Sequence, residues 1–290
     1  MKEELTALAE HKTWSLVPLP TGCKAIKGRW VFKLKLDADN KPVRFKARVV
    51  AKGFQQVYGI DYTETFAPVA KMKSIKLVLS IAAHFDLELK QLDFDTAFLN
   101  ASLIEDVYME QPDGFHVGGP NIVCKLHKAL YGLKQAPHDW NHTLHSSLVK
   151  LGYTRSRCDP CVYFKRNSSG RLIVLCVYVD DTIVAYHKRD ESIWLRDKEL
   201  ITNQYKIKDL GDCNWILNMR VTRDRANKRI MLCQEAYVSR ILRQYDMHES
   251  CSVTNPGMTS DLCKPNDETS IVLLNTEQHQ LYRSMVGSLL

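Results

Sequence analysis

Two adjacent aspartates, Asp180 and Asp181, stand inside the apolar stretch LIVLCVYVDDTIVAY at residues 172–186. Burying two neighbouring carboxylates is costly, because each loses its hydration and each repels the other. A solvent-facing hairpin turn would avoid this cost, and Asp is common in such turns. Hard divalent cations such as Mg²⁺, which prefer oxygen ligands, would offset it instead. The pair alone leaves both interpretations open.

A third carboxylate, Asp93, ends another predicted strand in the stretch LELKQLDF. A helix is expected from Pro137, since proline fits the first helical position and an apolar stripe follows it. Residues 191–205 are also expected to be helical. Strand, helix, hairpin and helix in this order are typical of a ferredoxin-like split βαβ unit, in which the first strand and the hairpin are neighbours. The pattern therefore brings Asp93 near Asp180 and Asp181.

Three aspartates on rigid strands suit one kind of chemistry in particular. Two-metal nucleotidyl transfer needs carboxylates from separate elements to hold two cations about 3.5 to 4 Å apart. One cation activates the attacking hydroxyl group, and the other binds the triphosphate and the leaving group. We therefore treat these three residues as a candidate catalytic set.

A strongly basic hairpin is expected over residues 29–50. RWVFKLKL and PVRFKARVV alternate apolar and polar residues, and DADNK between them is typical of a turn. The predicted polar face carries the cations Lys33, Lys35, Arg44, Lys46 and Arg48. Charges of this kind commonly form a solvated outer face, but an excess of cations also suits phosphate groups.

The composition indicates a globular protein of 290 residues with a net charge of +7, which is compatible with a polyanionic partner. No apolar run is long enough to span a membrane, and the charged N-terminus does not resemble a signal peptide. We therefore expect an intracellular protein with reduced cysteines and no membrane association. Cys158 and Cys161 in CDPC lack the second ligand pair that a zinc site requires.

Several motifs resemble those of reverse transcriptases. In chain order, LDFDTAFL resembles their first catalytic motif, LYGLKQAP the segment that opens the helix beneath the incoming nucleotide, and YVDD their Asp-Asp motif. WSLVPLP, RWVFKLK, FKARVVAKGFQQVYGIDYTETFAPVAK and QLDFDTAFLNA resemble the copia-type LTR retrotransposon reverse transcriptases. With IKDLGDCNWILNMRV, CQEAYVSRIL and YRSMVGSL, the resemblance extends over residues 14–287.

The resemblance implies an α+β fold: a polymerase right hand with fingers, a ferredoxin-like palm and a partial thumb. The expected divisions are a lead-in at 1–28, fingers at 29–86, a palm at 87–212 with a fingers insertion around 105–135, the end of the palm and start of the thumb at 213–250, and a linker or truncated connection at 251–290. Members of the family lie within a polyprotein, between integrase and ribonuclease H. The chain is therefore expected to be a truncated piece of such a polyprotein.

Functional residues follow from the motifs that match. The resemblance implies that Asp93, Asp180 and Asp181 are catalytic and bind two Mg²⁺ ions, or Mn²⁺, with the Phe94 carbonyl as a further ligand. Phe98 is expected to exclude a ribose 2′-hydroxyl. The residues implied in dNTP binding are Lys46, Arg48, Phe98, Gly132, Lys134 and Gln135, and those implied in template or primer binding are Tyr178, Pro137, Lys33 and Lys35. Whether Lys46 or Arg48 makes the main triphosphate contact stays open.

Four positions depart from the family pattern. His138 stands where the family usually has Arg, and Asn218 and Ala101 stand where Gly is frequent. Asparagine tolerates left-handed backbone angles, so Asn218 is a mild change. Asp95 occupies a position that is often basic, where its charge is expected to perturb the metal site.

The resulting hypothesis is an RNA- and DNA-templated DNA polymerase whose partners are an RNA template, a DNA primer and dNTPs. The family suggests a location in cytoplasmic virus-like particles or in the nucleus. One alternative is a transposon-derived relic that binds nucleic acid without catalysis. Another is an aspartic protease, prompted by Asp95-Thr96-Ala97, but such enzymes need two aspartates on glycine-containing turns, and no glycine follows here.

Overall fold

The computed structural model describes residues 1–36, 42–253 and 274–289. It divides into two compact units. The first comprises residues 1–214 and 223–230, and the second holds the other described residues. Each unit is described by itself below.

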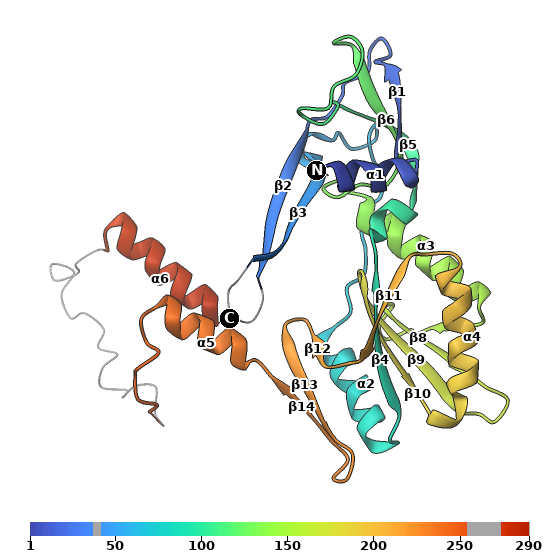
Figure 1. Ribbon diagram of the computed structural model, residues 1–290, viewed down its shortest axis with the longest axis vertical. Coiled ribbons are helices and arrows are strands. Elements are labelled where there is room, and N and C mark those ends of the chain that lie inside the picture. The colour runs from blue at the N-terminus through green and yellow to red at the C-terminus, as the bar shows by residue number, and fades with distance from the viewer. Residues whose placement is uncertain (37–41, 254–273, 290) are drawn as a thin grey trace. The chain divides into compact units, whose positions relative to one another are not determined.

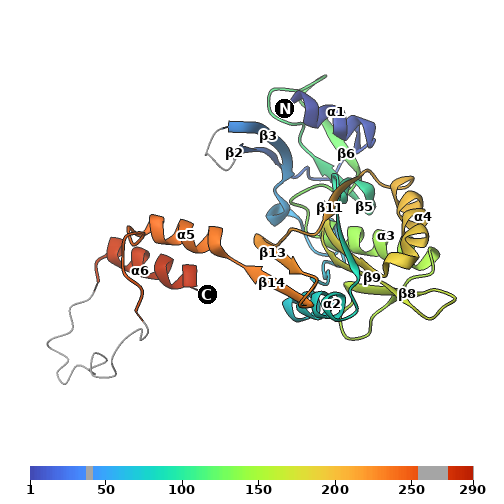
Figure 2. The same cartoon turned by 60° about the horizontal axis from the view of Figure 1, so that its bottom comes forward.

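The first unit is built around a six-stranded sheet with the order β11-β4-β10-β9-β8-β7. Its strands are β4 Glu88–Phe94, β7 Thr154–Arg155, β8 Val162–Arg166, β9 Leu172–Tyr178, β10 Asp181–Tyr186 and β11 Ile207–Asp212. Helices α3 (Ala136–Lys150) and α4 (Glu191–Thr202) cover one face, and α2 (Met72–His84) lies on the other (Figures 1 and 2). The predicted order of strand, helix, hairpin and helix is confirmed, and so is the pairing of β4 with the hairpin strand β10.

The continuous apolar run in β9 follows from its position inside this sheet. Residues 173–177 are all buried, because helices lie on both sides of the strand. A strand that is covered on both faces needs no alternation of apolar and polar residues. The main core lies between the sheet and the pair α3 and α4, where Trp140, Leu144 and Trp194 are buried.

Helix α2 buries the spaced residues Ile75, Leu79 and Ala82, as its periodicity predicts, whereas Met72 at its first turn is exposed. Its N-terminus is held from a distant loop. The carboxylate of Asp159, the Asp of the CDPC stretch, accepts hydrogen bonds from Lys71 N at 2.9 Å and Ser74 Oγ at 2.5 Å. The first of these bonds satisfies a backbone N–H that the start of a helix leaves free.

Two smaller sheets complete the strands of the first unit. Strands β1 (Trp14–Pro18), β6 (Ile122–Lys128) and β5 (Ser102–Met109) form a sheet in the order β1-β6-β5. The predicted basic hairpin is confirmed as β2 (Gly28–Leu36) and β3 (Pro42–Ala51), with Lys33 opposite Lys46. Its apolar face joins the core only near the base, where Val49 is buried and Trp30 packs against the core, whereas Phe32 is 67% and Phe45 81% exposed.

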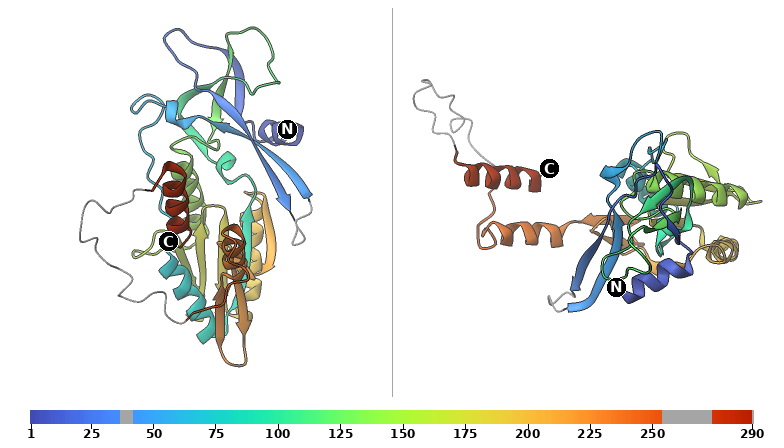
Figure 3. Two further views of the ribbon diagram at one scale, coloured as in Figure 1. Left: turned by 90° about the vertical axis from the view of Figure 1, so that its left-hand side faces the viewer. Right: turned by 90° about the horizontal axis from the view of Figure 1, so that it is seen from above.

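The lead-in expected at residues 1–28 contains regular structure. Helix α1 (Lys2–Glu10) lies beside β3, as Figure 3 shows, and its Leu8 joins the main core. The Glu3 carboxylate forms an ion pair with Arg44 at 3.2 Å. The Glu4 carboxylate accepts a hydrogen bond from Val49 N at 3.3 Å. The helix therefore contacts β3 at both ends, through Arg44 near the hairpin turn and Val49 near the base.

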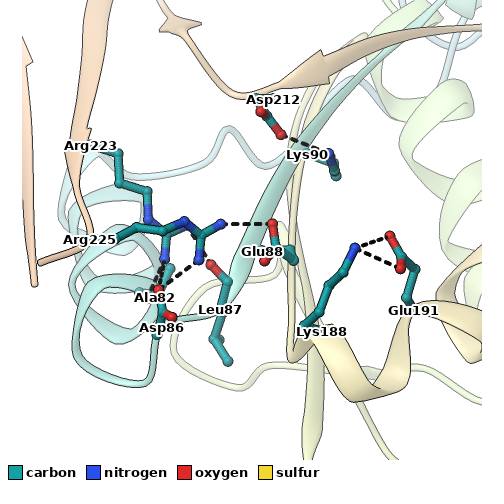
Figure 4. A network of polar contacts seen from close by, with 10 residues as sticks. All are labelled: Ala82, Asp86, Leu87, Glu88, Lys90, Lys188, Glu191, Asp212, Arg223 and Arg225. Carbon is teal, nitrogen blue, oxygen red and sulfur yellow. Dashed lines mark hydrogen bonds and ion pairs between the residues drawn. The ribbon is translucent and has the colours of Figure 1, made fainter.

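Two arginines anchor the beginning of β4 (Figure 4). Arg223 donates to the carbonyl oxygen of Leu87 at 2.5 Å. Arg225 donates to Asp86 at 2.7 Å and to Glu88 at 2.8 Å. All five residues belong to the first unit, so these bonds fix its strand β4 at the end remote from Asp93.

The remaining elements are β12 (Trp215–Ile216), β13 (Met219–Asp224), β14 (Arg229–Cys233), α5 (Glu235–Gln244) and α6 (Thr276–Leu289). Asn218, at the turn before β13, has a φ of 63°, the left-handed conformation that asparagine tolerates. Tyr237 in α5 donates a hydrogen bond to Ser288 O in α6 at 2.8 Å. In the stretch expected to be a linker or truncated connection, residues 276–289 are helical, while 254–273 lie outside the described residues.

Among the described residues, no helix combines the length and the apolar character needed to cross a lipid bilayer.

Candidate active site

The three predicted carboxylates meet at one end of the six-stranded sheet. Asp181 at the start of β10 is the register partner of Asp93 near the end of β4. Directly opposed residues of an antiparallel pair present their side chains on the same face. Asp180 belongs to the two-residue turn between β9 and β10, and Phe94 N donates to its carbonyl oxygen at 2.8 Å. The sheet register thus brings together residues that are 87 and 88 positions apart (180 − 93 and 181 − 93).

Burial and neighbouring negative charge raise the pKa of Asp93 and of Asp181. Burial raises the pKa of Asp93, and the neighbouring Asp180 carboxylate raises it further. For Asp181, burial is again the main cause, with contributions from Asp180 and Asp93, while a hydrogen bond from Gln91 Nε2 at 2.8 Å acts in the opposite direction. Each shift means that the cluster resists carrying its full negative charge. A cation at this end of the sheet would relieve that resistance.

One cation of the chain already lies there. Lys208 on β11 is the register partner of Asp93, and its Nζ is 4.0 Å from Asp93 Oδ2. The same ammonium group forms an ion pair with Asp95 Oδ1. The charge of Asp95, an unusual residue at this position, is therefore compensated by Lys208.

The donor set suits a hard divalent metal. In the described part of the chain, no group of three or more His, Cys, Asp or Glu side chains is arranged so that it could hold a metal ion. The carboxylates of Asp93, Asp180 and Asp181 nevertheless offer only oxygen atoms, and neighbouring negative charge adds to burial in raising the pKa of Asp93 and Asp181. Oxygen donors and net negative charge are what Mg²⁺ and Mn²⁺ require.

The turn that carries Asp180 has an unusual backbone. Val179 has a φ of 58°, which is rare for a β-branched residue. Its carbonyl oxygen accepts a hydrogen bond of 2.7 Å from Trp140 Nε1 on α3. The sequence shows Trp140 only as one apolar residue of the predicted helix, and nothing in it pairs an indole N–H with one particular carbonyl group.

On the predicted nucleotide side, three side chains form a column. The Phe98 ring, in the 3₁₀ helix η2 (Ala97–Asn100), meets the ring of Tyr131 edge to face at 4.7 Å. The Arg48 guanidinium lies over the Tyr131 ring, with its Cζ 4.5 Å from the ring centroid. Burial raises the pKa of Tyr131, and the Asp180 and Asp93 carboxylates add to this while Arg48 opposes it. Tyr131, which sequence reasoning passed over within LYGLKQAP, is thus part of the site.

A cavity of about 780 Å³ opens between α1 and β3 and reaches Asp95. Lys46 lines it together with Asp95, Thr96 and side chains of α1. Further cations on its wall are Arg44, Lys206 and Lys208. The same wall carries the carboxylates of Glu3, Glu4, Glu10 and Asp95, and its Lys208 lies 4.0 Å from Asp93 of the carboxylate cluster.

The residues of the LYGLKQAP motif have structural partners of their own. Gln135 is 1% exposed, and its Oε1 accepts a hydrogen bond from Gln56 Nε2 at 2.9 Å. Lys134 Nζ donates to Tyr62 OH at 3.0 Å. Gly132 crosses the end of β3 so closely that a Cβ atom would lie 2.1 Å from Ala51 O. These partners explain the residue types, and contacts of Gly132, Lys134 and Gln135 with a nucleotide stay predictions.

The predicted template and primer residues are spread over three elements. Tyr178 is half-buried at the end of β9, opposite Asp181. Pro137 lies in the first turn of α3, and Lys33 is exposed on β2. Lys35 pairs with Arg44 in the backbone register, but its side chain lies outside the described residues.

The other two departures from the family pattern cause no visible distortion. His138 Nδ1 lies 3.1 Å from Asp139 Oδ1 on the first turn of α3. Ala101 is fully buried with a φ of −88°, a conformation that does not require glycine.

Comparison with known proteins agrees with this geometry. Residues 11–259 match the family described as reverse transcriptase (RNA-dependent DNA polymerase). The chain belongs to this family. The match includes every residue of the carboxylate cluster and of the Arg48, Tyr131 and Phe98 column.

Related proteins of known origin place this reverse transcriptase domain among those of transposons. It is 43% identical over 292 residues to the retrovirus-related Pol polyprotein from transposon TNT 1-94 of Nicotiana tabacum, with 100% of the chain and 22% of the polyprotein covered. It is 35% identical over 291 residues to the Pol polyprotein from transposon RE1 of Arabidopsis thaliana, covering 100% and 19%. A putative transposon Ty5-1 protein of Saccharomyces cerevisiae is 34% identical over 200 residues, covering 69% and 62%.

The chain thus spans about a fifth of the length of the plant polyproteins that it matches. The resemblance to copia-type retrotransposon reverse transcriptases is confirmed.

Proposed function

We propose that the chain is an RNA- and DNA-directed DNA polymerase. In the reaction, a primer 3′-hydroxyl attacks the α-phosphate of a dNTP and pyrophosphate leaves. The observation that carries the proposal is the pairing of Asp181 with Asp93 across β10 and β4, with Asp180 in the adjoining turn. This arrangement supplies carboxylates from separate rigid strands, as two-metal nucleotidyl transfer requires.

In this proposal, Asp93, Asp180 and Asp181 hold two Mg²⁺ ions, or Mn²⁺, and the backbone carbonyl of Phe94 is a further ligand. When bound, the ions would activate the primer hydroxyl and neutralise charge on the phosphates. The protein keeps the carboxylates in place through the β4 and β10 ladder. Lys208 and Gln91 orient Asp93 and Asp181 from the side.

The nucleotide would enter beside the aromatic column. Lys46 and Arg48 would stabilise the triphosphate, whose transition state spreads negative charge over nonbridging oxygens. The flat ring of Phe98 would exclude a 2′-hydroxyl and so favour dNTPs. Of these residues, Lys46 lines the 780 Å³ cavity, whose wall carries both cations and carboxylates. Contacts of Lys33, Lys35, Tyr178 and Pro137 with template or primer belong to the same proposal.

The proposal also divides the chain as a polymerase right hand. Residues 87–212 would be a ferredoxin-like palm, which is supported by the strand order β11-β4-β10-β9 and the helices α3 and α4. Residues 29–86 would form the fingers, with an insertion around 105–135. Residues 213–250 would end the palm and begin the thumb.

Primer extension on an RNA template with Mg²⁺ and dNTPs tests the proposal. We expect extension by the parent chain and none by Asp180→Asn, at equal template binding. Asp212→Asn is the matched control, since it removes a carboxylate from β11 at an exposed ion pair. If neither the parent nor the control extends a primer while both bind template, the chain only binds nucleic acid and the catalytic proposal is wrong.

A further inference from the structure

The turn between β9 and β10 needs support from outside its own sequence. It consists of Val179 and Asp180, and Val179 holds a φ of 58°. β-branched residues rarely adopt such angles, and they persist only when the surrounding structure fixes them. A relaxed turn would carry Asp180 away from its present position relative to Asp93.

Both carbonyl oxygens of the turn are held by hydrogen bonds. Trp140 Nε1 on α3 donates to Val179 O at 2.7 Å. Phe94 N donates to Asp180 O at 2.8 Å. The second donor directly follows Asp93 in the chain, so this bond links the two carboxylate-bearing segments.

The indole of Trp140 also contacts the second of these segments. Its ring meets the Phe94 ring at 5.2 Å with an interplanar angle of 67°. Tyr205 packs against both rings, at 5.5 Å from Trp140 and 5.8 Å from Phe94. A single buried side chain therefore touches the turn that carries Asp180 and the strand that carries Asp93.

Trp140 and the side chain of Asp93 lie on opposite faces of the sheet. Leu92 and Phe94 point into the core with α3, whereas Gln91 and Asp93 alternate to the other face. Trp140 is only 2% exposed, so it is placed to support the carboxylates and not to touch a substrate.

We propose that Trp140 is a positioning residue that sets the spacing of Asp93 and Asp180, and through it the affinity of the site for divalent metal. The inference rests on the proposed polymerase function, because it takes these carboxylates as the metal ligands.

Trp140→Phe tests the inference because it keeps an aromatic ring beside Phe94 but removes the N–H that holds Val179 O. The matched control is Trp194→Phe. Trp194 is also 2% exposed and lies in the same core, but on α4, where its ring stacks on Tyr186 at 6.0 Å. Both variants lose the same atoms from the same core. Asp180→Asn serves as the variant that removes a ligand.

Binding of Mn²⁺ to the purified full chain is measured from the electron paramagnetic resonance signal of the free ion, and thermal unfolding is measured in parallel without metal. We expect Trp140→Phe to bind Mn²⁺ roughly tenfold more weakly than the parent, as is typical when a residue that orients metal ligands is lost. Trp194→Phe should match the parent in Mn²⁺ affinity while losing a similar amount of thermal stability. In primer extension, Trp140→Phe should need a correspondingly higher Mg²⁺ concentration for half-maximal rate, with the KM for template-primer unchanged.

Equal Mn²⁺ affinities for Trp140→Phe and Trp194→Phe would overturn the inference, whether both equal the parent or both are weakened alike. If Asp180→Asn loses Mn²⁺ binding in that case, the proposed function stands without it. Conversely, if Asp180→Asn binds Mn²⁺ as tightly as the parent, the metal does not bind at this turn. The proposed function would then fail together with the inference. A parent chain that binds no Mn²⁺ would have the same consequence.

Discussion

At the scale of single residues, the ring of Tyr131 lies between a cation and the proposed sugar-selecting aromatic. The Arg48 guanidinium covers one side of the ring, and Phe98 contacts it edge to face. Edge-to-face aromatic pairs and cation–π contacts each stabilise one relative orientation. The plane of Phe98 therefore depends on Tyr131, and selection against ribonucleotides should depend on both residues.

Phe98→Ala should increase the use of rNTPs relative to dNTPs by about 10- to 100-fold, because the side chain that would collide with the 2′-hydroxyl is gone. Tyr131→Ala should give a smaller increase in the same direction, and Tyr131→Phe, which keeps the ring, should give almost none. The measurement is the ratio of kcat/KM for dNTP and rNTP on one RNA template. An unchanged ratio in Phe98→Ala would show that another residue excludes the ribose.

The sequence was sufficient for some residues of the site and insufficient for others. Asp93 could be placed near Asp181 because the order of elements makes its strand a neighbour of the hairpin, while their direct pairing is seen only in the structure. The hydrogen-bond partners of Lys134 and Gln135 could not be predicted. They lie in the segment 56–62, more than seventy positions away, and no periodic pattern links the two segments. Such contacts depend on how loops meet in three dimensions, which periodicity does not encode.

At the scale of elements, the same limit separates the predicted from the unpredicted structure. Helix α2 buries one face, and strands β9 and β10 bury both of theirs. The apolar residues of these elements therefore form clear patterns in the sequence. Helix α1 buries only Leu8, and α6 buries no residue, so neither shows a clear apolar stripe. Their existence depends on local propensity, which is a weaker signal.

The crossing of two backbones at Gly132 leads to a prediction about stability. Gly132 has a φ of 94°, and a Cβ atom there would lie 2.1 Å from Ala51 O. Gly170 has a φ of 78°, but nothing lies within 4 Å of its Cβ position. Gly170→Ala should therefore cost only the left-handed backbone penalty of about 1 to 2 kcal/mol. Gly132→Ala should cost about 1 to 3 kcal/mol more, because β3 must also shift.

Urea unfolding of the two glycine variants measures the difference. If Gly132→Ala and Gly170→Ala lose equal free energy of unfolding, the close approach to Ala51 does not constrain the fold.

A buried ion pair joins the segment before β9 to the start of α4. Asp190 is buried, and it accepts hydrogen bonds from Arg171 Nε at 2.8 Å and Arg171 Nη2 at 2.7 Å. These bonds, and the positive charge of Arg171, lower the pKa of Asp190 below its ordinary value of 3.8 despite burial. A lowered carboxyl pKa means that the pair stabilises the folded state above pH 3.8, and that this stability is lost as the pH falls through the lower, folded-state pKa.

Asp190→Asn should lower the free energy of unfolding by about 2 kcal/mol at pH 7, the usual value for hydrogen bonds to a charged group. The loss should be the same at pH 5 and should shrink below pH 3.8, where the parent also becomes protonated. Urea unfolding across this pH range provides the measurement. Asp212→Asn, at the exposed pair with Lys90, should cost less than about 1 kcal/mol. A loss for Asp190→Asn that does not change with pH would contradict the assigned role of the charge.

At the scale of the whole molecule, the net charge of +7 has a specific distribution around the first unit. The basic face of the β2 and β3 hairpin carries Lys33 opposite Lys46, and the cavity beside the carboxylates adds Lys206 and Lys208. Only the cations that contact phosphates release counterions when nucleic acid binds, whereas cations elsewhere do not. The salt dependence of template binding therefore shows which part of the positive surface meets the nucleic acid.

Lys33→Gln should weaken binding of an RNA–DNA template-primer and reduce the slope of log K against log salt concentration by about 0.7 to 0.9, the value for one lost phosphate contact. Lys150→Gln is the matched control, because Lys150 is an exposed lysine at the end of α3. It changes the net charge by the same amount, so a purely long-range effect would act equally on both variants. Fluorescence anisotropy of a labelled template-primer between low and moderate salt gives both slopes. Because long-range attraction follows total charge and contact follows position, equal slopes for the two variants would exclude Lys33 from the template surface, whereas a lower slope for Lys33→Gln alone would assign the hairpin's basic face to it.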